Sequence, residues 1–213
     1  MKNIKSIIGL FFIIPLFSFG NTINVNQDGS GNFASIQSAI LFASTGDTVL
    51  VHPGNYIEII DFIGKDITVA SLFLTTQDTS YISQTVIDGN QENNRLVRFT
   101  NGETEDAKLI GFTITRATDP IEPGGIYVIQ GLGIYINSSS PIIANNRIIN
   151  NSYEGWYYSG GGIAMKNSSA KIKNNIIGSN DKVFHGGGIY MNKCTNVVIE
   201  ENYIHDNTLF PGY

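Results

Sequence analysis

The stretch GGGIAMKNSSAKIKNNIIGSN, residues 160–180, decides the fold. Its apolar residues come in short bursts, first Ile163 with Met165, then Ile172, then Ile176 with Ile177. This spacing does not match the three- and four-residue period of an amphipathic helix. A run of glycines precedes the bursts, and asparagines separate them. The stretch therefore favours short strands joined by frequent turns, since glycine and asparagine both accept left-handed backbone conformations.

Two neighbouring stretches, residues 131–151 and 186–207, carry the same residue types in the same order. The spacing is 29 residues from Asn146 to Asn175 and 27 residues from Asn175 to Asn202. A near-constant period in this range indicates a repeat architecture. The matching positions are Ile134, Ile163 and Ile189; Ile136, Met165 and Met191; Ile143, Ile172 and Ile199; Ile148, Ile177 and Ile204; Asn146, Asn175 and Asn202; and Asn151, Asn180 and Asn207.

The spacing within each unit predicts an all-β solenoid, a three-sided parallel β-helix. Apolar residues two apart are typical of strands, and each unit holds three such fragments between polar corners. Stacked coils would place the isoleucines in apolar columns and would bond the corner asparagines from coil to coil, with their own backbones left-handed. The glycine runs would let the chain lie flat on the next coil. Leucine is too scarce in these units for a leucine-rich repeat.

The amino-terminal half predicts a helix that covers the open end of the solenoid. Residues 35–43 place apolar side chains at helical spacing, and an uncovered coil would expose its core and strand edges. Strands are predicted at residues 48–51, 67–70 and 85–87, with a turn at residues 53–55. The regular coils are expected to begin at Leu109.

Residues 1–20 read as a secretory signal peptide, with cleavage after Gly20. Lys2 and Lys5 precede an apolar stretch, residues 7–19, that is shorter than the roughly 20 residues needed to span a bilayer. The sequence therefore predicts a secreted or cell-surface protein whose mature β-helix domain is residues 21–213 and has no membrane span. The single cysteine, Cys194, is expected to be a small buried apolar residue without a reactive role.

Composition limits the partners of the mature chain. Its formal charge is 11 − 18 = −7 once the two leader lysines are removed, and it has no basic patch of the kind that nucleic-acid binding requires. The sequence indicates no cofactor and no metal site, and it leaves Ca²⁺ binding open. Because Gly212 stands where another glycine run would begin, we expect further coils or a further domain after residue 213.

Several motifs resemble the secreted right-handed parallel β-helix proteins of the pectate-lyase-like superfamily. These motifs are DGSGNF at residues 28–33, IQSAI at 36–40, GDTVLVHPGNYIE at 46–58, GKDITV at 64–69 and TVIDGN at 85–90. The likeness covers about residues 22–210 and implies right-handed coils. It leaves the activity open, because this superfamily includes lyases, hydrolases, esterases and proteins without known chemistry.

Pectin methylesterases are similar in this opening segment and share Gly54, Tyr56 and Glu58 with it. Their catalytic aspartate, glutamine and arginine motifs are not matched here. The stretches QDT at 77–79 and DFIG at 61–64 come in the reverse order and too early, so we interpret them as coincidental. Pectate lyases use clustered aspartates for Ca²⁺ and an arginine base. This sequence has no acidic cluster beside Arg116 or Arg147, the arginines of the coil region.

The candidate site lies in the variable loops that follow Asn151, Asn180 and Asn207. Stacked coils would carry these loops to one flank, and loops on a rigid scaffold commonly bind ligands. Aromatic rings beside carboxylates suit sugars. The candidate ligand-binding residues are Tyr153, Trp156, Tyr157, Tyr158 and Phe184, and the weaker catalytic candidates are Glu154, Asp181, His185 and Asp206. His52 is expected to be structural.

Three functions remain open from the sequence. The first is polysaccharide binding without an identified catalytic centre. The second is a polysaccharide-acting enzyme, either pectate-lyase-like or glycoside-hydrolase-like, with pectinesterase chemistry less favoured. The third is a structural or adhesion spacer whose loops bind nothing.

Overall fold

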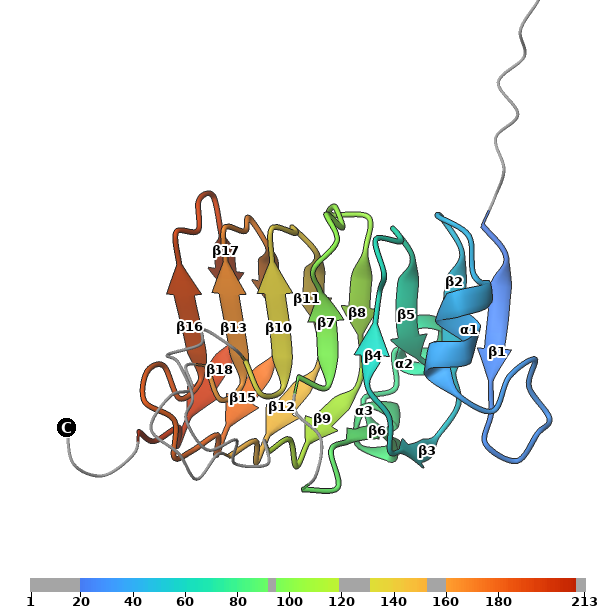
Figure 1. Ribbon diagram of the computed structural model, residues 1–213. Coiled ribbons are helices and arrows are strands. Elements are labelled where there is room, and N and C mark those ends of the chain that lie inside the picture. The colour runs from blue at the N-terminus through green and yellow to red at the C-terminus, as the bar shows by residue number, and fades with distance from the viewer. Residues whose placement is uncertain (1–19, 92–94, 119–130, 153–159, 210–213) are drawn as a thin grey trace, which may run out of the picture.

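The chain winds through three parallel sheets, each strand of which pairs with its equivalent in the next coil (Figure 1). The computed structural model describes residues 20–91, 95–118, 131–152 and 160–209. Sheet 1 contains β1 (Thr22–Val25), β2 (Thr48–Val51), β5 (Thr68–Ser71), β8 (Lys108–Ile110), β11 (Ile142–Ala144), β14 (Lys171–Lys173) and β17 (Val198–Glu200).

Sheets 2 and 3 complete the triangle of the β-helix. Sheet 2 contains β4 (Ile60–Asp61), β7 (Val97–Phe99), β10 (Ile134–Asn137), β13 (Ile163–Lys166) and β16 (Ile189–Asn192). Sheet 3 contains β3 (Gly54–Tyr56), β6 (Thr85–Asp88), β9 (Thr113–Thr115), β12 (Arg147–Ile149), β15 (Ile176–Gly178) and β18 (Tyr203–His205). The predicted parallel β-helix with three strands per coil is therefore confirmed.

The core consists of the predicted apolar columns. Ile134 pairs with Ile163 and Ile163 pairs with Ile189, each in register. Ile134 and Ile163 are fully buried. In the last described coil the same columns reach solvent, and Ile204 is 47% exposed although Ile177 beneath it is buried. Within the described residues, the apolar column is therefore buried at Ile177 and partly exposed at Ile204.

Two ladders of buried asparagines run along the corners on either side of sheet 3. Asn175 donates from Nδ2 to the carbonyl of Ile143 at 2.9 Å and to Oδ1 of Asn202 at 3.0 Å. Its own Oδ1 accepts from the backbone N–H of Asn146 at 2.9 Å. Asn151, Asn180 and Asn207 repeat the pattern. The predicted coil-to-coil bonding is confirmed, and it satisfies backbone groups that would be costly to bury unpaired.

The expectation that the ladder asparagines themselves take the left-handed conformation is wrong. The left-handed residue is the one just before each ladder position, for example Asn145 at φ 56° and Asn174 at φ 53°. This residue, half-buried at Asn145 and exposed at Asn174, makes the turn, and the following asparagine is rotated into the corner with its amide buried. Asn150, Ser179, Glu201 and Asp206 occupy the same turning position.

The glycine runs lie where the backbone of one coil passes closely over that of the next. A Cβ on Gly162 would lie 2.6 Å from the carbonyl oxygen of Gly188 and 2.9 Å from Cγ2 of Ile177. A Cβ on Gly161 would lie 2.6 Å from the carbonyl oxygen of Gly187. The predicted reason for the glycine runs is therefore confirmed by these distances.

The predicted amino-terminal helix is present as α1 (Ile36–Phe42), which packs against β1, β2 and β4. The hydroxyl of Ser35 caps it by accepting from the N–H of Ser38, and Ile36, Ala39 and Ile40 are buried. Figure 1 shows α1 beside the first strands at one end of the stack. The amino-terminal end of the core is covered by α1, as the solenoid requires.

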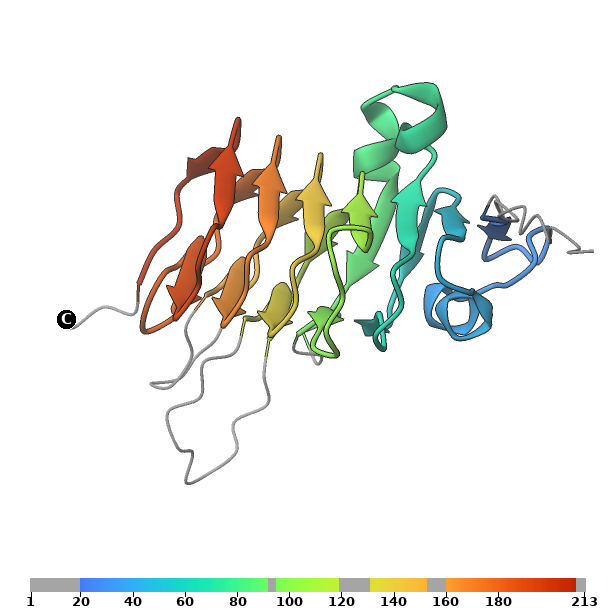
Figure 2. The same ribbon diagram turned by 90° about the horizontal axis from the view of Figure 1, so that it is seen from above.

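The structure corrects other expectations for the amino-terminal half. The predicted strands at residues 48–51, 67–70 and 85–87 are confirmed as β2, β5 and β6. The turn predicted at residues 53–55 is wrong, because β3 already begins at Gly54. Regular coils begin well before Leu109. The chain also leaves the stack after β5 to form α2 (Phe73–Thr76) and α3 (Ser80–Gln84), which project from one side in Figure 2.

Candidate functional site

The structure describes part of the loop flank on which the candidate residues were placed. Asp181, Phe184, His185 and Asp206 are described, whereas Tyr153, Glu154, Trp156, Tyr157 and Tyr158 lie outside the described residues. The predictions for those five residues therefore stay predictions.

The described parts of the loops leave the coils in register. Ser152 forms a parallel bridge with Asp181, and Val183 forms one with Leu209. The N–H of Asp181 also donates to the carbonyl of Asn151 at 3.2 Å. The loops that connect sheet 3 to sheet 2 thus begin above one another along a single corner of the β-helix.

An aromatic stack, which we name the corner stack, forms from Phe184, His185 and Tyr190. The ring centroids of Phe184 and His185 are 4.4 Å apart and meet edge to face. His185 and Tyr190 lie 6.0 Å apart with their planes 14° from parallel. The carbonyl of His185 accepts from the N–H of Gly160 at 2.8 Å, which ties the loop to the preceding coil.

Sequence reasoning missed Tyr190 in this stack, although the strand pattern contains the signal. Tyr190 lies on β16 between Ile189 and Met191, which occupy the inward columns. Because side chains alternate along a strand, the tyrosine must point outward.

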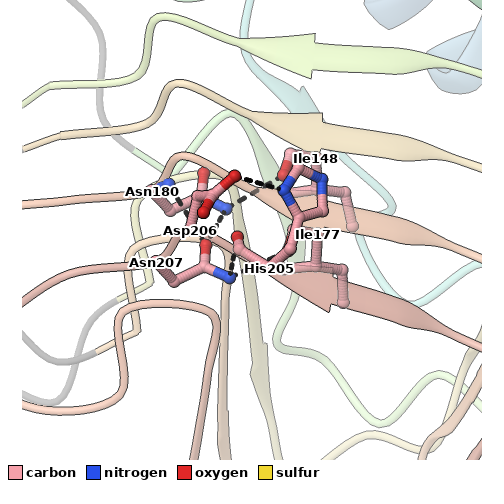
Figure 3. A network of polar contacts seen from close by, with 6 residues as sticks. All are labelled: Ile148, Ile177, Asn180, His205, Asp206 and Asn207. Carbon is pink, nitrogen blue, oxygen red and sulfur yellow. Dashed lines mark hydrogen bonds and ion pairs between the residues drawn. The ribbon is translucent and has the colours of Figure 1, made fainter.

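Asp206 pairs with its neighbour His205 rather than standing in a variable loop. Its Oδ2 lies 2.9 Å from Nδ1 of His205 (Figure 3), and its side chain is 82% exposed. Asp206 takes the left-handed turning position at φ 48°, directly before the ladder residue Asn207. The described polar contacts of Asp206 therefore join it to the end of β18, not to His185.

The outward face of β18 carries a second aromatic pair. The rings of Tyr203 and His205 are 4.5 Å apart and 27° from parallel, and Tyr203 is 65% exposed. The imidazole lies over Gly178, where a Cβ would come within 2.5 Å of Nε2. Glycine at that position therefore gives the ring its place against the sheet.

Strand register extends this pair into a flat surface on sheet 3. Ile176 lies beside Tyr203, and Arg147 lies beside Ile176, so the row spans about 10 Å at the usual strand separation. Ile176 is itself 37% exposed. We name this surface the sheet-3 platform; it consists of Arg147, Ile176, Gly178, Tyr203, His205 and Asp206.

An ion pair between a buried carboxylate and a partly exposed guanidinium lies at the amino-terminal side of the same sheet. Asp88 on β6 is buried and pairs with the guanidinium of Arg116. Burial raises the pKa of Asp88, but hydrogen bonds from Arg116 and from the N–H of Asn90 outweigh it and hold the pKa below its usual value. This pair stabilises the corner and keeps the carboxylate charged.

Tyr56 and Glu58, whose spacing resembles a motif of pectin methylesterases, have structural roles here. Glu58 accepts from the N–H groups of Ile36 and Gln37 at 2.9 Å each, so it caps α1. Tyr56 is buried and donates to the carbonyl of His52 at 2.9 Å, and burial raises its pKa to about 12. The Gly-x-Tyr-x-Glu spacing therefore provides no evidence for esterase chemistry.

A polar hollow lies at the amino-terminal end and was not predicted from the sequence. It has a volume of about 380 Å³ and is lined by Asn24, Asn26, Ser30, Gly31, Asn32 and His52. His52 was expected to be structural; its carbonyl binds Tyr56, while its imidazole Nε2 lies 3.4 Å from Oδ1 of Asn24 on the hollow's wall. The amides and hydroxyl of the hollow largely bond one another.

The described ranges of the chain contain no group of three or more histidine, cysteine, aspartate or glutamate side chains placed to hold a metal ion. None of the helices in those ranges is long and apolar enough to cross a membrane. Cys194 packs against the core but is only half-buried, so the expectation of a fully buried residue is wrong.

Comparison with known proteins identifies the family. No curated protein matches the chain. The family described as the right handed beta helix region matches residues 21–212, nearly the whole sequence. Together with the three parallel sheets, this match establishes that the chain belongs to the right-handed β-helix family.

Proposed function

We propose that the protein binds polysaccharide outside the cell through the sheet-3 platform. The observation that carries this proposal is Tyr203, a large ring that is 65% exposed yet stacked on His205 above a flat strand surface. A ring that is already held in place loses little conformational freedom on binding. Its flat apolar face suits the C–H face of a sugar ring.

Polar groups beside Tyr203 suit the hydroxyl groups of the same sugar. The carboxylate of Asp206 is largely exposed and accepts hydrogen bonds, and the guanidinium of Arg147 donates them. The bond between His205 and Asp206 orients both side chains before a ligand arrives. The platform thus combines an apolar centre with polar ends, the arrangement expected at carbohydrate contacts.

The corner stack extends the proposed sugar-binding surface toward the loop flank. Phe184, His185 and Tyr190 add aromatic surface at the corner that follows sheet 3. The predicted ligand residues Tyr153, Trp156, Tyr157 and Tyr158 belong in sequence to the equivalent loop one coil earlier. We propose that this loop contributes further sugar contacts, with Trp156 the first to test.

Two sequence features support the extracellular setting and the choice of ligand. Residues 1–20 have the charge and hydrophobicity of a signal peptide. The amino-terminal motifs resemble the pectate-lyase-like superfamily, which includes enzymes that act on polysaccharides. Acidic and neutral plant or microbial glycans are therefore the first ligands to screen.

The test is binding to a glycan array, followed by calorimetry on the best ligand. We expect Tyr203→Ala to weaken binding by about tenfold or more, because the stacking surface is lost. Tyr203→Phe keeps that surface and should bind nearly as wild type. Phe42→Ala is the matched control, since Phe42 is 69% exposed on α1 at the other end of the molecule. Unchanged binding by Tyr203→Ala would refute the platform.

The other two functions are distinct outcomes of the same screen. Glycoside cleavage requires two carboxylates about 5–9.5 Å apart. Glu154, a candidate for one of them, lies outside the described residues. Release of reducing ends, unsaturated sugars or methanol from a bound glycan would replace simple binding with an enzymatic function. Failure of the wild-type protein to bind any glycan would refute glycan binding and favour the structural or adhesion spacer.

A further inference from the structure

Asn21, the residue after the predicted cleavage point, has its backbone nitrogen held against a carboxylate. The N–H of Asn21 donates to Oδ1 of Asp47 at 2.7 Å. The carbonyl of Asn21 accepts from the N–H of Thr48 at 2.8 Å, which continues the pairing of β1 with β2. The position of this nitrogen is therefore set by the first strand pair of the sheet and not by the residues before it.

The carboxylate of Asp47 is held in place as a hydrogen-bond acceptor for this nitrogen. It is only 6% exposed, and its Oδ2 accepts from the N–H of Ser44 at 2.8 Å. That backbone hydrogen bond outweighs burial and, together with the bond from Asn21, holds the pKa of Asp47 below its usual value. The carboxylate is therefore charged over the whole neutral range.

The nearby charged side chains bond to groups other than the Asp47 carboxylate, so a cation at Asn21 would not compete with them. Lys65 acts on Asp47 through space, but its Nζ binds the carbonyls of Ile40, Leu41 and Ala43 at the end of α1. Asp66, whose carbonyl accepts from Gly46, binds Thr104 with its carboxylate. Neither side chain is hydrogen bonded to Asp47 in the described contacts.

Gly20 is tightly confined where the chain enters the fold. A Cβ at this position would lie 1.7 Å from the carbonyl oxygen of Gly46, so the register of β1 requires glycine there as long as residue 20 is attached. A small residue at this place is also what signal-peptide cleavage requires. Folding and processing thus impose the same residue on position 20.

We propose that cleavage of the Gly20–Asn21 bond creates an ion pair between the new α-ammonium group of Asn21 and the carboxylate of Asp47, which locks β1 to the sheet. A signal peptidase supplies the hydrolysis: the C–N bond breaks, hydroxyl from water adds to the Gly20 carbonyl carbon, and the Asn21 nitrogen takes up protons to become an ammonium. A hydrogen bond from a neutral amide to a charged carboxylate becomes an ion pair between two opposite charges in the same place. The proposal rests on the predicted leader and is independent of glycan binding.

The test compares chains that differ only at this nitrogen. One chain begins at Asn21 with a free amine, the second begins at Asn21 with an acetylated amine, and the third retains Gly20. Acetylation preserves the N–H donor of the uncleaved chain and removes only the charge. The melting temperature of each is measured from about pH 6 to pH 10, across the ordinary pKa range of an α-amino group.

The free-amine chain is expected to melt several degrees above the other two near neutral pH. The carboxylate raises the folded-state pKa of the amine, so the added stability is fully present below the unfolded pKa of about 8 and is lost as pH rises through the folded value. Parallel pH profiles for the free and acetylated chains would overturn the proposal.

Two further measurements separate the ion pair from a general effect of the amino terminus. Asp47→Asn, introduced into the free-amine and acetylated chains, should abolish the difference between them. A persistent difference in that background would assign the effect to another group. If Asp47→Asn does not fold, the acetylated chain alone still decides the result. Sequencing of the exported protein should find Asn21 first, and a different first residue would contradict the proposed processing site.

Discussion

The carboxylate of Glu58 and the ammonium of Lys65 bind opposite ends of α1. Glu58 accepts from the N–H groups of Ile36 and Gln37 at the start of the helix, and Lys65 donates to three carbonyls at its end. Both charges have the sign that complements the helix dipole. A helix of seven residues is too short to be stable by itself, so these contacts and its buried face hold it over the core.

Replacing Glu58 by glutamine should destabilise the fold by about 1 kcal/mol, the usual magnitude for a lost helix cap. Lys65→Met should have a comparable effect, because three helix-end carbonyls lose their donor. Urea denaturation measures both free energies of unfolding. Glu105→Gln is the control, since the Glu105–Lys171 pair is exposed and should matter little. Equal effects from Glu58→Gln and Glu105→Gln would contradict the capping role.

Replacing Asn175 by alanine should cost about 3 kcal/mol or more. The change leaves the carbonyl of Ile143 and the N–H of Asn146 buried without their partners. Asn174→Gly at the adjacent turning position is the matched control, because glycine accepts its φ of 53° and its side chain is exposed. Thermal and urea unfolding would measure both. A larger loss of stability for Asn174→Gly than for Asn175→Ala would show that Asn174, and not Asn175, stabilises the corner.

Gly162→Ala should destabilise the solenoid by about 1–3 kcal/mol through overpacking, because the added methyl meets the backbone of the next coil. Gly29→Ala provides the comparison: Gly29 has open space around it and a φ of 84°, so only backbone strain is introduced. Unfolding of both variants in urea measures the two costs. The coil-stacking explanation predicts a crystal structure of Gly162→Ala in which residues 187–188 move outward, and it fails if they do not move.

Arg116→Met should change the acid stability of the protein. In the wild type the pKa of Asp88 is lowered, so its contribution is present above the unfolded pKa of about 3.9 and is lost as pH falls through the folded value. Without the guanidinium, fewer hydrogen bonds offset burial, so the pKa of Asp88 rises relative to the wild type and its charge stabilises the fold less at neutral pH. Melting temperatures of the two proteins should therefore diverge as pH rises from about 3 to 7.

The control for this effect is Asp88→Asn in the Arg116→Met background. That double variant has no carboxylate at position 88, so the added pH dependence should disappear. If wild type and Arg116→Met follow parallel curves instead, the pair does not govern the acid response.

The fold could be predicted from the repeats because columns and ladders impose the same residue on each coil. Residues 131–207 repeat, and their strands, apolar columns and corner bonds were all predictable. The excursion through α2 and α3 occurs once, so no comparison between coils could reveal it. The turning residue was misplaced because many corners contain two asparagines in a row. Alternation resolves them, since Asn146 lies two residues before the inward Ile148 and so faces the same way.

The candidate site was harder to predict because its exposed aromatic residues lie on a strand, whereas ligand-binding residues were expected in the loops. Tyr203 and His205 lie on either side of the inward Ile204, so the same alternation would have placed both outward. Their mutual stacking could not be read from the sequence, because it depends on Gly178 in the neighbouring coil. Asp206 was grouped with the loop residues Asp181 and His185 as a catalytic candidate, whereas its described polar contact is with His205.

The corner ladders also give the molecule an order of assembly. The backbone N–H groups of four ladder residues find their acceptor in an asparagine 27 or 29 residues later in the chain; the four are Asn146, Asn151, Asn175 and Asn180. During synthesis from the amino terminus, these corner hydrogen bonds therefore cannot form until the next coil of the chain has been synthesised. We therefore expect the corners to be completed in chain order, one coil after another, with α1 covering the first layer.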